Sequence, residues 1–151
     1  MKLAEALIER AEIQKENGKL LSRIKDNAMV QEGDSPAESP DELIAAYNKN
    51  MERLLFLTQR INETNSKTPF DDKMNIAEAI ALRDCLGAKN RAYREIYSNA
   101  TIKPDRYSQK EVRFVRCIDI KDLQTQIDKF SKEYRELDTK IQGINWTIDL
   151  L

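Results

Sequence analysis

The sequence predicts a mainly α fold: an up-down bundle of about four helices with a long, coiled-coil-like C-terminal helix and a small two-stranded β-ribbon. Glycine and proline, which interrupt helices, number only four each, and 34% of the residues are charged, a composition typical of long helices. Apolar residues also recur at heptad spacing towards the C-terminus. We expect a single helical domain over residues 1–151, a common domain length.

The first helix is predicted over residues 2–26, where leucine and isoleucine recur at helical spacing. Gly18 is a weak point in it, because glycine costs about 1 kcal/mol relative to alanine inside a helix. Residues 27–39 contain Gly33, Pro36 and several small polar residues, so they predict a loop. A short strand at 28–32 would fit inside this loop.

The second helix has a clear start signal. Ser39 can act as the N-cap, Pro40 suits the first helical position, and Glu42 completes a capping box. A third helix is predicted to begin near Asn75. It carries a row of small residues that would let another helix approach closely: Ala77, Ala81, Ala88 and Ala92.

A strand is predicted near 111–118, because β-branched and aromatic residues alternate there with arginines. A lone strand needs a backbone partner, and the segment at 28–32 is the other candidate. We therefore expect these two segments to form the two-stranded ribbon.

The C-terminal helix carries the strongest pattern in the chain. Its apolar residues follow a 3-4 spacing over more than four heptads. A helix of about 30 residues is about 45 Å long, so another long helix, from the same chain or from a partner, must cover it. The seam consists of Ile120, Leu123, Ile127, Phe130, Tyr134, Leu137, Ile141, Ile144, Ile148 and Leu151.

Several classes of function are disfavoured by composition. The chain has no histidine, which removes the usual general base and the commonest nitrogen ligand of metals, and we expect no cofactor, metal or catalysis. A net charge of −1 argues against nucleic-acid binding. We expect a cytoplasmic protein without membrane spans, in which Cys85 and Cys117 are reduced, buried thiols.

Two groups of charged residues are candidates for binding a small ligand or phosphate. Arginines interleaved with aromatic residues suit contact with anions. The residues with which we expect such a site to be built are Arg83, Asp84, Arg106, Tyr107, Arg113 and Arg116. A second row on the third helix predicts either a salt-bridge network or a small polar pocket, and it consists of Asp84, Arg91, Arg94 and Glu95.

The C-terminal helix also offers residues for contact with another subunit. Arg135 and Asp138 lie off the apolar seam, and Trp146 forms a second apolar side. Because tryptophan and arginine are enriched at interfaces, we expect a homo-oligomer. The interface candidates are Tyr134, Arg135, Asp138, Asn145 and Trp146.

In combination, several segments resemble a family of small bacterial helical proteins, of which some carry the label septicolysin and others are domains of unknown function. The segments are MKLAEALIERA, NAMVQEGDSPAESPDEL, INETNSKT, AIALRDCL and the block from RYSQKEVRFVRCID to LQTQIDKFSKEYRELDTKIQGINWT. The resemblance implies a bacterial origin and a helical fold. The label implies a pore-forming cytolysin, although the sequence has no membrane span and no long amphipathic hairpin that could line a pore.

The sequence thus favours a non-catalytic cytoplasmic protein that self-associates through long helices as an interaction or scaffold module. A small-ligand or phosphate-binding protein, including an enzyme, with an arginine-rich polar pocket is the first alternative. A pore-forming cytolysin is the second.

Overall fold

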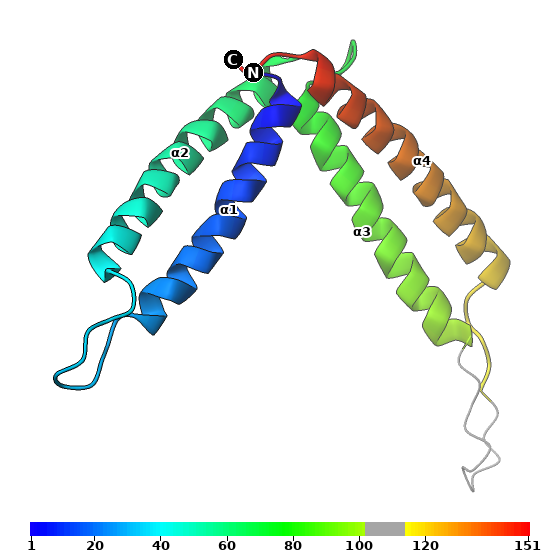
Figure 1. Cartoon of the computed structure of the whole chain (residues 1–151). Coiled ribbons are helices and arrows are strands. Elements are labelled where there is room, and N and C mark those ends of the chain that lie inside the picture. Colours follow the sequence, from blue (N-terminus) through cyan, green and yellow to red (C-terminus); the bar gives the residue numbers. More distant parts are fainter. Residues whose placement is uncertain (102–113) are drawn as a thin grey trace, which may run out of the picture. The chain divides into compact units, whose positions relative to one another are not determined.

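The structure, a computed structural model, describes residues 1–101 and 114–151 and contains four long helices over these residues (Figure 1). Helix α1 spans Leu3–Asp26 and α2 spans Pro40–Lys67. Helix α3 spans Ile76–Thr101 and α4 spans Ile120–Thr147. The mainly α class and the four predicted helices are confirmed, and the predicted start signal of α2 is present: Ser39 Oγ accepts a hydrogen bond from the Glu42 amide at 3.4 Å.

By their contacts, the residues group into two compact units. The first comprises residues Met1–Ile76 and Gln142–Leu151. Within it, α1 and α2 lie side by side as an antiparallel hairpin, and an ion pair of 2.7 Å joins Glu9 to Arg53. The apolar core of this unit includes Leu3, Ala6, Leu20, Leu43, Leu57 and Ile61.

The two ends of the chain meet in the first unit. The Leu3 amide donates to the Ile148 carbonyl at 3.1 Å, and the Leu150 amide donates to the Met1 carbonyl at 2.9 Å. The hydroxyl of the fully buried Thr64 accepts a hydrogen bond from the Leu151 amide at 3.0 Å. The last residues of the chain are therefore hydrogen-bonded both to α2 and to the start of the chain at α1.

The second unit comprises residues Ala77–Ile141, and in it α3 and α4 form another antiparallel pair. The rings of Tyr93 and Phe130 meet edge to face with their centroids 5.1 Å apart. All positions of the predicted apolar seam on α4 are buried or half-buried, apart from the exposed Leu151 after the helix. Up to Ile141 the helix that covers this seam is α3 of the same chain, so no partner is needed to cover it.

The predicted β-ribbon is not supported. The described residues contain no strand, only two isolated bridges, and residues 28–32 are all exposed. The strand predicted at 111–118 falls partly outside the described residues, and its remainder from 114 to 118 is irregular. A strand forms only where a neighbour supplies backbone partners, and these two segments belong to different units.

Two other expectations, one about the packing face of α3 and one about the cysteines, are wrong. The alanines of the predicted close-contact row are exposed, and α3 packs on α4 through a neighbouring row that includes Leu86 and Tyr93. These larger side chains remove more apolar surface from water than alanines would, which explains why that row faces α4. The cysteines, predicted to be buried, are both exposed.

Candidate functional site

Arg83, a predicted ligand-binding residue, forms ion pairs with two carboxylates. Its guanidinium donates to Asp84 Oδ1 at 2.8 Å and, across to α4, to Asp138 Oδ1 at 3.1 Å. Partial burial opposes the charge, but these two partners outweigh it and raise the pKa of Arg83 above its usual value. Arg83 therefore acts as a structural link between α3 and α4.

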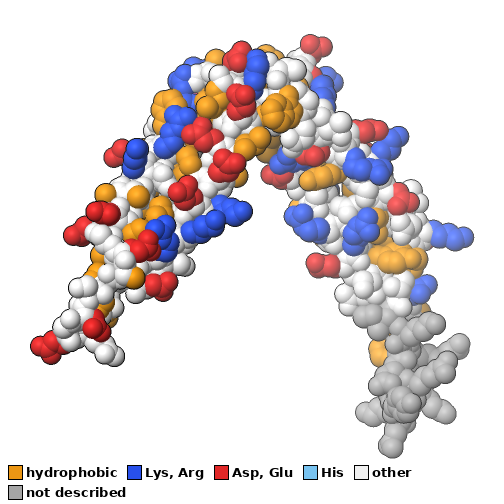
Figure 2. Space-filling model, viewed as in Figure 1, with side chains coloured by type: hydrophobic (Ala, Val, Ile, Leu, Met, Phe, Trp, Pro, Cys, Tyr) orange, Lys and Arg blue, Asp and Glu red, His pale blue; other side chains and the backbone are white. Residues whose placement is uncertain are grey.

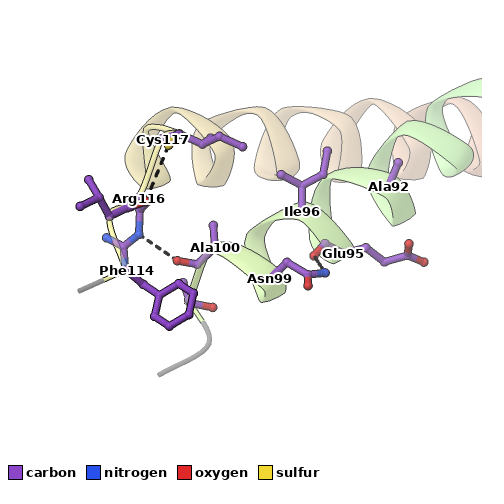
Figure 3. A pocket seen from close by; sticks show the side chains of 11 residues that line it. Ala92, Glu95, Ile96, Asn99, Ala100, Phe114, Arg116 and Cys117 are labelled. Atoms are coloured by element: carbon purple, nitrogen blue, oxygen red, sulfur yellow. Dashed lines mark hydrogen bonds between the residues drawn. The ribbon is translucent and has the colours of Figure 1, made fainter. Parts of the chain in front are cut away.

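Arg116 lies at the other end of α3, where its Nε donates to the Ala100 carbonyl at 2.9 Å. The position of Ala100 is about 25 Å from that of Arg83 along the helix. Arg116 borders a hollow of about 990 Å³ whose walls are the end of α3 and residues 114–118 (Figure 3). The structure thus does not bring Arg83 and Arg116 together, while the predicted site residues Arg106, Tyr107 and Arg113 lie outside the described residues.

Three of the predicted interface residues are used within the chain. The ring of Tyr134 lies against Gly87 of α3, Asp138 binds Arg83, and Asn145 is only 5% exposed. Trp146, in contrast, is 57% exposed, and Arg135 is exposed as well. Arg135 lines a second hollow, of about 420 Å³, between α3 and α4 together with Arg91 and Arg94.

A row without charges runs along one side of each helix of the α1–α2 hairpin. Each row follows the 3-4 spacing that keeps residues on one side of a helix. On α1 the row consists of Ala4, Leu7, Ala11, Gln14, Gly18 and Leu21. On α2 it consists of Ile44, Asn48, Met51, Leu55, Thr58 and Asn62.

The two uncharged rows belong to the same side of the hairpin. Asn17, next to the row of α1, donates to the sulfur of Met51 at 3.3 Å, which places the rows beside each other. Glu9 and Arg53 pair on the opposite side, and their hydrogen bond lowers the pKa of Glu9. We call these two rows together the uncharged face.

The uncharged face leaves large apolar side chains in solvent. Leu55 is 59% exposed, and Leu21, Ile44 and Met51 are each at least 40% exposed. Elsewhere, as Figure 2 shows for the side in view, charged side chains of both signs stand among the hydrophobic ones. The spacing of the apolar residues of α2 in the sequence does not separate those facing α1 from those left exposed.

Neither a metal site nor a membrane-spanning helix is found in the part of the chain that the structure describes. The described residues contain no cluster of three acidic or cysteine side chains that could hold a metal ion. No helix formed by these residues is long and apolar enough to cross a membrane.

Comparisons with other proteins show where the chain belongs. A solved structure, described as that of a functionally unknown conserved protein from Corynebacterium diphtheriae, is similar over 100% of this chain and 99% of its own, with 40% identity and a TM-score of 0.95. No curated protein matches the chain. The model of a family of unknown function, DUF6847, matches residues 10–150. Neither finding supports the septicolysin label, and the chain belongs to the family DUF6847.

Proposed function

We propose that the chain is a non-catalytic, cytoplasmic interaction module that self-associates through the uncharged face of the α1–α2 hairpin. The observation that carries the proposal is the absence of charge along both rows, in a chain in which 34% of the residues are charged. A solvated helix face normally carries charged or polar residues, whereas an exposed apolar patch marks an interaction site.

A second copy of the chain is the occupant that fits this face best. Two hairpins that meet through the same face form a four-helix arrangement, which buries both pairs of rows. Because the face has no charge, two copies do not repel each other there, and it offers no charge pattern with which to select a different partner. Gln14 and Asn48 lie within the rows, where a polar residue can fix the register of paired helices.

The size of the face is adequate for a stable dimer. Helix α1 has 24 residues, which corresponds to a length of about 36 Å. With the helix axes about 10 Å apart, the hairpin presents a face roughly 20 Å wide, or about 700 Å² per copy. This is close to the value of about 800 Å² per partner that is typical of specific interfaces.

Size-exclusion chromatography with light scattering tests the proposal. At tens of micromolar, we expect a mass twice the 17.5 kDa of one chain. Replacing Met51 and Leu55 together by glutamate places charges in the interface, so this variant should be monomeric. A monomeric wild-type protein at that concentration would contradict the proposal.

The matched control is the double variant Ala45→Glu and Gln59→Glu. Both positions are exposed on α2 but lie outside the uncharged row. We expect this control to remain dimeric with unchanged helix content. If the control dissociates as readily as the Met51 and Leu55 variant, charge on α2 in general, and not the uncharged face, decides the oligomeric state.

The alternatives have less support. The hypothesis of a small-ligand or phosphate site built on Arg83 and Arg116 has less support. Arg83 pairs with two carboxylates, and Arg116 donates a hydrogen bond to the Ala100 carbonyl. Pore formation has no support from the comparisons, which describe proteins of unknown function. We therefore retain self-association as the proposed function.

A further inference from the structure

We propose that Arg91, Arg94 and Arg135 form a binding site for the phosphate group of a small molecule, in the hollow of about 420 Å³ between α3 and α4. We call these three residues and this hollow the arginine pocket. It lies within the second unit, whereas the uncharged face belongs to the first, so the two proposals are independent.

Within the described residues, no carboxylate pairs with any of the three guanidinium groups. Among residues 1–101 and 114–151, none of the three forms an ion pair, although four other arginines each pair with a carboxylate: Arg23, Arg53, Arg60 and Arg83. Arginine stays protonated at physiological pH, so three positive charges gather around one hollow. An anion bound there would relieve their mutual repulsion.

A hydrogen-bond network holds Arg94 in position. The Asn90 side-chain oxygen accepts from Arg94 Nε at 2.7 Å. The Asn90 amide nitrogen donates across to α4, to Ser131 Oγ at 2.7 Å and to the Ile127 carbonyl at 3.0 Å. Asn90 thus uses both ends of its amide to join the two helices and to fix one edge of the guanidinium. Arg94 Nη2 also donates to Ser131 Oγ at 3.4 Å, and the other N–H groups of Arg94 form no hydrogen bond among the described residues, so they are available to a ligand.

Gly87 makes room for the pocket. A Cβ atom at this position would lie 3.2 Å from Tyr134 Cε2 and 3.5 Å from Arg91 Nη1. A methyl group at this position would therefore force the Tyr134 ring to move away from α3 by a few tenths of an ångström, whereas its distance from Arg91 is an ordinary contact. Glycine costs about 1 kcal/mol in a helix interior, and at this position it provides the space for the ring of Tyr134, which lines the hollow.

Phosphate is the ligand class that suits this chemistry. Guanidinium groups bind phosphate oxygens through paired, charge-assisted hydrogen bonds, and several arginines around one hollow can share a dianion. Ser131 Oγ also lines the hollow. The volume lies within the range of about 300–1,000 Å³ that is usual for small-molecule sites. A carboxylate, with one negative charge, would gain less from three cations.

The test is an NMR titration of the full-length protein at low ionic strength, in which the arginine Nε–H signals are followed. The probes are inorganic phosphate, pyrophosphate and ribose 5-phosphate, which distinguish a free anion from a phosphorylated small molecule. We expect saturable shifts of the Arg91, Arg94 and Arg135 signals with at least one probe. Unsaturated, linear shifts up to about 10 mM of every probe would overturn the proposal.

Variants localise the binding. The double variant Arg94→Gln and Arg135→Gln should weaken binding at least about tenfold. Lys129→Gln removes a charge from α4 outside the pocket and should change the affinity less than about twofold. Asn90→Ala tests the positioning of Arg94 and should weaken binding while all three charges remain. Equal loss in Lys129→Gln and in the double variant would mean that net charge, and not the pocket, attracts the anion.

Discussion

Three glycines lie inside helices, and the same substitution to alanine should affect them differently. A Cβ atom would meet nothing within 4 Å at Gly18 of α1 or at Gly143 of α4, whereas at Gly87 it would meet Tyr134 Cε2 at 3.2 Å. At the two open positions alanine should stabilise the helix by about 1 kcal/mol. In a protein of this size, this corresponds to a rise of about 2–4 °C in the melting temperature.

At Gly87 the gain in helix propensity is opposed by overpacking. Forcing extra atoms into a packed contact costs about 1–3 kcal/mol, so the net effect of Gly87→Ala should lie between about zero and a loss of 2 kcal/mol. Gly143→Ala is the matched reference, because Gly18 belongs to the uncharged face, where an added methyl group could also change self-association.

Thermal unfolding followed by circular dichroism at 222 nm measures the difference. We expect Gly143→Ala to melt above the wild-type protein and Gly87→Ala to melt at or below it. In the NMR titration, Gly87→Ala should also weaken phosphate binding, because Tyr134, which lines the arginine pocket, must move. A Gly87→Ala variant as stable as Gly143→Ala would refute the close packing of Tyr134 on α3.

Three further predictions concern the ion pairs, the chain ends and the thiols. Hydrogen bonds from Arg53 and Arg23 lower the pKa values of Glu9 and Glu38 below the usual 4.5. The free energy of unfolding that these pairs contribute is therefore present above pH 4.5, and it is lost as the pH falls through the lowered pKa values. Melting temperatures measured against pH should therefore fall less steeply in this range for Glu9→Gln with Glu38→Gln than for the wild-type protein. Thr64→Val should cost about 0.5–1.5 kcal/mol in urea unfolding followed by Trp146 fluorescence, because it removes the acceptor of the partly buried hydrogen bond from the Leu151 amide, while Thr64→Ser should retain most of the stability. Cys85 and Cys117 are both exposed, so Ellman's reagent should label both thiols in the native protein as completely as in urea; a thiol that reacts only after unfolding would contradict this exposure.

The helices were predictable because their signals are local. The N-cap at Ser39 and the heptad seam of α4 are set by residues within a few turns of one another, and the structure has both. The β-ribbon failed for the opposite reason. Alternation at 111–118 indicates only that a segment could be a strand, whereas pairing depends on a distant partner that the pattern cannot reveal.

Which side of a helix faces its neighbour was only partly predictable. On α3, the row of alanines and the row containing Leu86 and Tyr93 both had suitable spacing, and the larger apolar area of the second decides the packing. The ligand-site prediction was limited in the same way. Arg83 has Asp84 beside it in the sequence, but its second carboxylate, Asp138, comes from α4, and the sequence does not show which arginine of α3 this residue meets.

The division of the chain into two units makes the two proposals separable by experiment. Met51 and Leu55 belong to the first unit, and Arg94 and Arg135 belong to the second. We therefore expect the monomeric glutamate variant of Met51 and Leu55 to bind phosphate as the wild-type protein does, and the glutamine variant of Arg94 and Arg135 to remain a dimer. Loss of phosphate binding in the monomeric variant would show that the arginine pocket is complete only in the assembled dimer. The anion would then stabilise the dimer, because a ligand that binds the assembled form alone shifts the equilibrium towards it.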